Sequence, residues 1–170
     1  MATDVRILPM RKRDLAQVMA IEQEVFPEPW SRNVFVSELA QRRGREYRVG
    51  KVARAVVGYF GLMLVEDEAH VSTIAVASSF QHQGVATLFM LESVRLAREN
   101  GVKRVTLEVA VSNERAMSLY RRFGFAPVGV RKGYYQATGE DAYLMVVEGV
   151  DTPAYATRMA GIIRELRSAK

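Results

Sequence analysis

The chain has 170 residues, with 24 lysines and arginines against 19 aspartates and glutamates, and a net charge of +5. It has no cysteine and only two histidines, which excludes disulfides, thiolate nucleophiles and zinc–thiolate sites and argues against a histidine metal cluster. The length suits one domain with a sizeable core. Because it has no signal peptide and no apolar run of about 18 residues, we expect a cytoplasmic protein.

In chain order, the residue pattern predicts a strand at 5–8, a helix at about 13–25 and a second helix that Ser31 caps and that ends near 42. Strands are expected at 47–52, 56–65 and 71–76, followed by a long helix from 85 to 99, a strand at 104–109 and a helix at 113–123. Two strands near 125–131 and 142–147 come next, and an amphipathic helix begins at Pro153. This order predicts an α/β domain over residues 1–150, with helices on both faces of a mixed sheet and a helix over 151–170 appended to it.

The stretch Gln81–Ala86 joins the apolar strand at 71–76 to the long helix. A glycine loop that opens a helix presents free backbone N–H groups and the positive end of the helix dipole, which favours a phosphate. Gly84 has no Cβ and lets an anion approach the backbone closely. The loop has neither the Walker nor the Rossmann pattern, so a different phosphate-bearing ligand is expected. An ordinary strand-to-helix turn is the alternative.

Gln81, Gly84 and Ala86 match the Gln/Arg-x-x-Gly-x-Gly/Ala motif with which GNAT acyltransferases cradle the pyrophosphate of acetyl-CoA. The segment 107–125 resembles the later GNAT motif in which Asn opens a helix and Leu-Tyr precedes Gly-Phe. More narrowly, Leu-Glu-Val-x-x-Ser-Asn followed by Ala-x-x-Leu-Tyr is similar to RimI-type ribosomal-protein-alanine N-acetyltransferases and their archaeal N-terminal acetyltransferase relatives. The segments 26–31, 131–135 and 139–142 resemble the same group, so the resemblance spans about residues 5–148.

This resemblance implies the GNAT fold, with a mixed, mostly antiparallel sheet, and acetyl-CoA as co-substrate without a metal. It implies a protein N-terminus as substrate, in a ribosomal protein or more broadly, and no binding to DNA or membrane. The cofactor-binding residues it implies are Ile74, Ala75, Val76, Gln81, His82, Gln83, Gly84, Val85, Ala86, Thr87 and Asn113. From the residues alone, Ile74–Val76 are core strand residues and Asn113 is a helix cap.

Glu108 and Tyr120 are the expected catalytic pair. The strand alternates, with Thr106 and Glu108 on one face, and inside the sheet an unpaired carboxylate is costly. The resemblance makes Glu108 the general base, acting directly or through a water if burial raises its pKa. It makes Tyr120 the acid that protonates the departing CoA thiolate. The alternatives are a solvated strand end for Glu108 and an amphipathic core residue for Tyr120.

The expected substrate-binding residues lie in predicted loops: Phe26, Glu28, Trp30, Tyr134 and Tyr135. Solvent exposure or packing at the sheet edge is the alternative for them. Arg42, Arg43 and Arg45 would contact ribosomal RNA or form solvated surface. Two other functions stay open: a GNAT enzyme acting on a small amine or a lysine, and a noncatalytic acyl-CoA-binding module. The oligomeric state is not predicted.

Overall fold

The structure is a computed structural model that describes residues 4–169. Within these residues a single sheet has the strand order β1-β2-β3-β4-β5-β7-β6. The strands are β1 (Arg6–Pro9), β2 (Arg45–Val52), β3 (Ala55–Val65), β4 (Glu68–Val76), β5 (Arg104–Ala110), β6 (Ala126–Tyr135) and β7 (Glu140–Glu148). Neighbouring strands are antiparallel except β4 and β5, which are parallel. The prediction of a mixed, mostly antiparallel sheet is confirmed.

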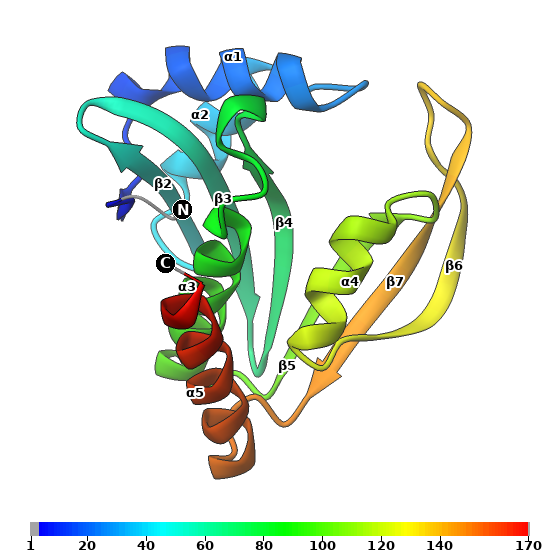
Figure 1. The fold of residues 1–170 in the computed structure, drawn as a ribbon. Helices are drawn as coiled ribbons and strands as arrows, with labels where there is room; N and C mark the ends of the chain where they lie inside the picture. Colours follow the sequence, from blue (N-terminus) through cyan, green and yellow to red (C-terminus); the bar gives the residue numbers. More distant parts are fainter. Residues whose placement is uncertain (1–3, 170) are drawn as a thin grey trace.

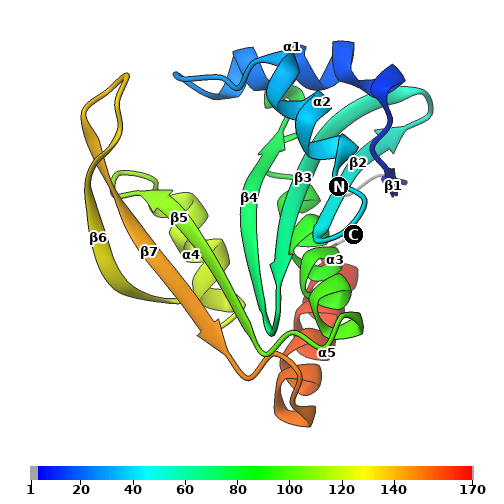
Figure 2. The same ribbon diagram turned by 180° about the vertical axis from the view of Figure 1, so that it is seen from behind.

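Helices cover both faces of this sheet, as predicted. They are α1 (Leu15–Val25), α2 (Arg32–Ala40), α3 (Val85–Glu99), α4 (Glu114–Arg122) and α5 (Pro153–Ser168), with short 3-10 turns η1 (Lys12–Asp14) and η2 (Ser78–Phe80). Figure 1 shows α3, α4 and α5 in front of the strands, and Figure 2 shows α2 across β2 and β3 on the reverse face. Each face therefore has its own apolar core.

Strand β5 shows how the sequence pattern sets the two faces. Val105, Leu107 and Val109 are buried in the core shared with α3 and α4. Thr106 and Glu108 alternate with them and point to the opposite face. The predicted alternation thus places Glu108 away from the α3–α4 layer.

Some boundaries differ from the prediction. β4 begins at Glu68 instead of residue 71, because its ladder with β3 starts at the pair Val65–Glu68. Ser31 precedes α2, but its side chain makes no capping hydrogen bond. Tyr134 and Tyr135 end strand β6 instead of lying in a loop. β6 is an exposed edge strand that runs past its predicted end at residue 131, and this part lacks the apolar alternation by which strands are recognised.

Helix α5 is bound to the main body through both side chains and backbone. Tyr155 is buried in the α3–α4 core, and its hydroxyl donates to Phe123 O at 2.6 Å. Arg98 of α3 donates to Val150 O, just before α5. We infer from this packing that α5 belongs to the same domain as the described residues that precede it. None of the helices within residues 4–169 is long and apolar enough to cross a bilayer.

Candidate active site

The sheet opens between β4 and β5. Their pairing covers only Glu68–His70 against Arg104–Thr106, and beyond it the two strands diverge toward their carboxyl ends (Figures 1 and 2). A pocket of about 430 Å³ lies at this opening, lined by α3, α4 and the end of β4. Because the carboxyl ends of parallel strands are a usual place for ligands, this opening is the candidate site.

One extra residue in β4 lies just before the residues of this strand that line the pocket. Gly61 pairs with Thr73 and Leu62 with Val71, so Ser72 is an extra, unpaired residue of β4 and forms a bulge between these two pairs. A bulge shifts the alternation of side chains along the strand. The expected cofactor residues Ile74, Ala75 and Val76, which follow the bulge, all line the pocket.

The loop from β4 to α3 forms a second wall. Gly84 is the N-cap of α3 at φ +82°, a left-handed conformation that glycine adopts without steric cost. No side chain caps α3, so the amides of its first turn are free for an anion. The expected residues of this segment that line the pocket are Gln81, His82, Gly84, Val85, Ala86 and Thr87.

Two glutamines stabilise the loop itself. Gln81 Nε2 donates to Val76 O at 3.0 Å, which ties the loop to the end of β4. Gln83 Nε2 donates to Ser79 O at 3.2 Å. Gln83 is thereby turned back toward η2 and lies outside the pocket lining, unlike the other expected cofactor residues.

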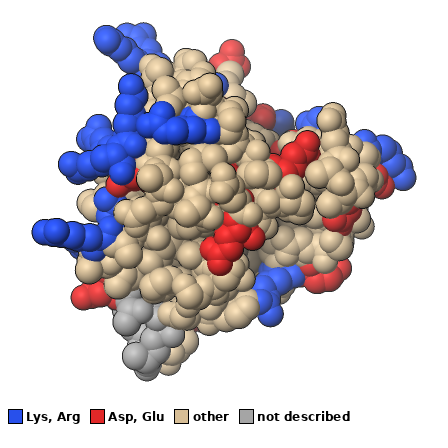
Figure 3. Space-filling view, turned by 90° about the horizontal axis from the view of Figure 1, so that it is seen from above, with Lys and Arg blue, Asp and Glu red and all other residues tan. Residues whose placement is uncertain are grey.

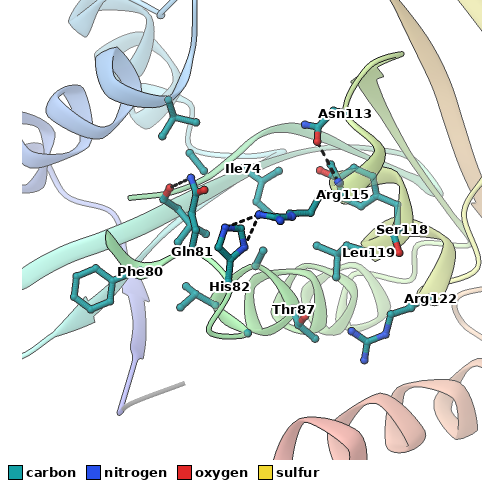
Figure 4. A pocket seen from close by; sticks show the side chains of 18 of the residues that line it. Ile74, Phe80, Gln81, His82, Thr87, Asn113, Arg115, Ser118, Leu119 and Arg122 are labelled. Atoms are coloured by element: carbon teal, nitrogen blue, oxygen red, sulfur yellow. Dashed lines mark hydrogen bonds between the residues drawn. The ribbon is translucent and has the colours of Figure 1, made fainter. Parts of the chain in front are cut away.

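Helix α4 forms the opposite wall. Asn113 Oδ1 accepts a hydrogen bond from Ala116 N at 3.2 Å and so caps α4, as predicted. Arg115 and Arg122, about two helical turns apart, both line the pocket. Arg115 Nη1 lies 2.6 Å from His82 Nδ1, and Figure 4 shows this contact crossing the pocket from α4 to the loop. The pocket thus joins a free helix N-terminus to two cationic side chains.

Tyr120 faces the same pocket from α4. Its side chain is buried, with the ring packed 6.0 Å from that of Phe125. Burial, and secondly the charge of Tyr135, raise the pKa of Tyr120 above its ordinary value. The phenol therefore keeps its proton throughout the physiological pH range.

Glu108 is held by two basic groups on the other face of the sheet. Its Oε2 lies 2.9 Å from His70 Nε2 and its Oε1 lies 3.2 Å from Arg131 Nε. Burial is the largest single influence and raises the pKa of Glu108, but the hydrogen bond and charge of His70, together with Arg131, outweigh it. The pKa of Glu108 is therefore lowered, so the condition considered from the sequence, that burial raises it, is not met.

His70 and Arg131 are the two neighbours of Glu108 that the sequence does not single out as site residues. His70 pairs with Thr106 in the parallel register of β4 and β5, which places position 70 on the face that carries Glu108. A parallel pairing between strands far apart in the chain leaves no local signal. The alternation that put Glu108 and Thr106 together would have found His70 once that register was known.

A buried carboxylate fixes the loop between α1 and α2. Glu22 is 2% exposed and accepts hydrogen bonds from Trp30 N, at 2.8 Å, and from the Tyr59 hydroxyl. Burial raises the pKa of Glu22, and both hydrogen bonds oppose that rise. The Trp30 ring packs 5.3 Å from Phe35 in the α1–α2 core. Of the expected substrate residues in this loop, Phe26 reaches the pocket lining.

The hairpin between β6 and β7 approaches this loop over the open end of the sheet (Figures 1 and 2). Glu28 Oε2 accepts a hydrogen bond from Ala137 N at 3.5 Å. Tyr134 and Tyr135 form an edge-to-face pair with centroids 5.0 Å apart. Burial raises the pKa of Tyr134, and that of Tyr135 to about 12, with a further contribution from the charge of Glu108. The charge of Glu108 therefore acts on both tyrosines.

Charged residues outside the pocket could in principle form a metal-binding group or a basic patch. No group of three or more His, Cys, Asp or Glu within residues 4–169 is arranged to hold a metal ion. Figure 3 shows most of the visible lysines and arginines along one side of the face above α1, with acidic groups in its middle and both acidic and basic groups on its other side. Arg45 is paired with Glu38 at 2.5 Å, whereas Arg42 and Arg43 are exposed in the turn after α2.

Known proteins share both this fold and these motifs. The model of the Acetyltransferase (GNAT) family matches residues 15–125. The chain is 33% identical over 155 residues to the N-alpha-acetyltransferase of Saccharolobus solfataricus, covering 84% of this chain and 92% of that one. It is 31% identical over 145 residues to the ribosomal protein bS18-alanine N-acetyltransferase of Escherichia coli, covering 83% and 95%. The crystal structure of the Escherichia coli ribosomal-protein-S18-alanine N-acetyltransferase superposes with a TM-score of 0.78 and 29% identity, over 85% of this chain and 93% of that chain. The chain therefore belongs to the GNAT acetyltransferase family.

Proposed function

We propose that this protein transfers the acetyl group of acetyl-CoA to the N-terminal α-amine of a protein. The observation that carries the proposal is the pair of half-sites at the sheet opening. One face offers an anion-accepting pocket with the protonated phenol of Tyr120, and the other offers the Glu108–His70 pair. The relatives support the choice of acceptor, because one is named for N-alpha acetylation and one for the alanine of a ribosomal protein.

The residues of the pocket fit acetyl-CoA, which GNAT acetyltransferases use. The uncapped first turn of α3, opened by Gly84, suits a pyrophosphate. Arg115 and Arg122 supply the positive charge that further phosphate oxygens require. The strand residues Ile74–Val76 bring backbone amides and apolar side chains to the pocket, which suits the pantetheine arm. Acetyl-CoA supplies the activated thioester, and the side chains that bind it and move protons come from this protein.

An α-amine suits the base that this site provides. An α-amine has a pKa near 8, so a fair fraction is neutral at physiological pH, whereas a lysine amine has a pKa near 10.4. Since the pKa of Glu108 is lowered, Glu108 is a weak base that suits an amine already close to neutral. The Glu108–His70 pair accepts the amine proton directly or through a water.

The bond changes then balance without an enzyme nucleophile. The amine nitrogen bonds to the thioester carbonyl carbon, the carbon–sulfur bond breaks, and the amine loses one proton to the Glu108–His70 pair. Tyr120 donates its phenolic proton to the departing sulfur and regains one from solvent. Tyr135 is coupled electrostatically to both Tyr120 and Glu108, which supports placing the acid and the base on two sides of one reaction centre.

The test is acetylation of synthetic peptides that contain an internal lysine and begin with Ala, Ser, Met or Glu, followed by fragmentation mass spectrometry. Label on the α-amine is expected, with a peptide that begins as ribosomal protein S18 does among the better substrates. The same peptides with a blocked N-terminus are the control and should stay unlabelled. Label confined to lysine, or turnover of small amines alone, would contradict the proposal.

A further inference from the structure

A row of polar side chains continues from Glu108 along the seam between β4 and β5. His70 Nδ1 lies 2.7 Å from Thr106 Oγ1, and Thr106 Oγ1 lies 3.5 Å from Glu68 Oε1. With the 2.9 Å contact from His70 Nε2 to Glu108 Oε2, four side chains form one continuous hydrogen-bonded chain. It runs from the proposed base to a carboxylate that is 41% exposed. Thr106 is buried, and the proposed reaction gives its hydroxyl no chemical step.

The donors and acceptors in this hydrogen-bonded row determine which ring nitrogens of His70 carry a hydrogen. When the Thr106 hydroxyl donates to Glu68, its oxygen can only accept from His70, so Nδ1 carries a hydrogen. Ionised Glu108 only accepts, so Nε2 carries a hydrogen as well. In that state His70 is an imidazolium. It donates from Nε2 to Glu108 and from Nδ1 to Thr106, which donates in turn to Glu68.

Loss of one proton has a single outcome that keeps both hydrogen bonds of the His70 ring, and it releases the bond from Thr106 to Glu68. The neutral ring keeps its hydrogen on Nε2, where it still donates to Glu108. Nδ1 then becomes an acceptor, and the Thr106 hydroxyl rotates from Glu68 to donate to it. A hydroxyl can serve both states because it accepts and donates; a methyl group in its place could serve neither.

We propose that Thr106, backed by Glu68, is a positioning residue that determines which ring nitrogens of His70 carry a proton, and thereby when Glu108 is free to accept one. Beside an imidazolium, the Glu108 carboxylate is neutralised by a full positive charge and is a poor base. Beside the neutral ring it keeps an oriented N–H donor and gains proton affinity. The inference rests on the proposed function only through the role of Glu108 as base.

Other charged or titratable groups face this row from each neighbouring strand. Arg131 of β6 contacts Glu108, and Tyr134 and Tyr135 of the same strand lie close to it. Arg104 of β5 lies 3.6 Å from Glu68 and 2.7 Å from Glu148 of β7. The test therefore leaves all of these in place and changes only the hydroxyl or its distal partner.

The test uses Thr106→Val, which keeps the shape and removes the hydroxyl, with Thr106→Ser as the conservative variant and Glu68→Gln as the distal one. The chain has only two histidines, so nuclear magnetic resonance of the imidazole nitrogens, with His82→Gln for assignment, follows His70 directly. Thr106→Val should lower the midpoint at which His70 leaves the imidazolium state, by somewhat less than about one pH unit, because the hydroxyl bonds both states but a hydrogen bond to a charged group is the stronger. Thr106→Ser should restore the midpoint, and Glu68→Gln should lower it by less.

The acidic midpoint of the kcat/KM profile should move with the resonance midpoint, while the Kd of acetyl-CoA stays unchanged, because Thr106 does not line the pocket. A resonance midpoint and tautomer that are the same in Thr106→Val and wild type would overturn the inference. A shifted resonance with an unshifted rate profile would overturn its link to Glu108. Failure of the wild-type protein to acetylate any N-terminus contradicts the proposed function instead, and the resonance titration still decides the role of Thr106.

Discussion

Replacing Glu108 by Gln tests the proposed base with the least change in shape. The amide oxygen can still accept from His70 Nε2, which lies 2.9 Å from the carboxylate, but it cannot take a proton. General base catalysis contributes about 10²–10⁴ in rate, or about 3–5 kcal/mol. Because the pKa of Glu108 is lowered and an α-amine is partly neutral at pH 7, we expect the lower end, about a 10²-fold loss.

The assay is a single-turnover measurement with enzyme in excess over peptide and saturating acetyl-CoA, so that product release does not hide the chemical step. Calorimetry should give an unchanged Kd for acetyl-CoA, since Glu108 does not line the pocket. Glu148→Gln is the matched control, because Glu148 is also a strand glutamate paired with an arginine, on the neighbouring β7, and should keep the wild-type rate. A wild-type single-turnover rate in Glu108→Gln would refute the assignment.

The same variant carries a prediction about stability. A carboxylate whose folded pKa is lowered contributes stability that is present above its unfolded pKa, here near 4.5, and lost as the pH falls through the folded value. The difference in free energy of unfolding between wild type and Glu108→Gln should therefore be largest near neutral pH and shrink in acid. Urea titrations at pH 7 and pH 3 measure it, and a difference that grows in acid would contradict the ion pairing of Glu108.

Three further outcomes are expected. Tyr120→Phe should lower the single-turnover rate about 10²-fold and leave the Kd of acetyl-CoA unchanged. An unchanged rate would contradict the role of Tyr120 as the acid. Gly84→Glu should abolish acetyl-CoA binding, since it puts a negative charge and a strained φ of +82° at the anion site. The control is Gly101→Glu, which lies just beyond the other end of α3, also at positive φ but in open space, and this variant should bind acetyl-CoA normally. Tyr59→Phe removes a donor from the buried carboxylate under the α1–α2 loop, so it should cost about 1–3 kcal/mol of stability. The cost should be larger at neutral than at acidic pH, because the hydrogen bond from Tyr59 lowers the pKa of Glu22 and so favours its ionised form. Tyr47→Phe, which removes a buried hydroxyl that makes no close hydrogen bond among the described residues, should cost less.

Local sequence was sufficient for the elements and for the anion site. The strand before Gln81, the glycine at 84 and the amphipathic helix after it are adjacent in the chain, so their geometry follows from short-range preferences of the backbone. The same holds for the cap at Asn113, which acts on its own helix, and for the alternation along β5 that separates Glu108 from the apolar core. The exposed edge strand β6 was predicted near 125–131, but its end at Tyr135 was not, because a strand without a buried face carries no alternation that marks where it stops.

The protonation chemistry of the site needed the tertiary structure. That Glu108 would be acidic followed from the residue, and that it would face away from α3 and α4 followed from the pattern of β5. That its pKa would be lowered did not follow, because His70 comes from a parallel neighbour and Arg131 from a strand two places away in the sheet. The sign of a pKa shift is a balance between burial and the charges within a few ångströms. A linear pattern reports burial, but only the paired register of distant strands decides which charges those are.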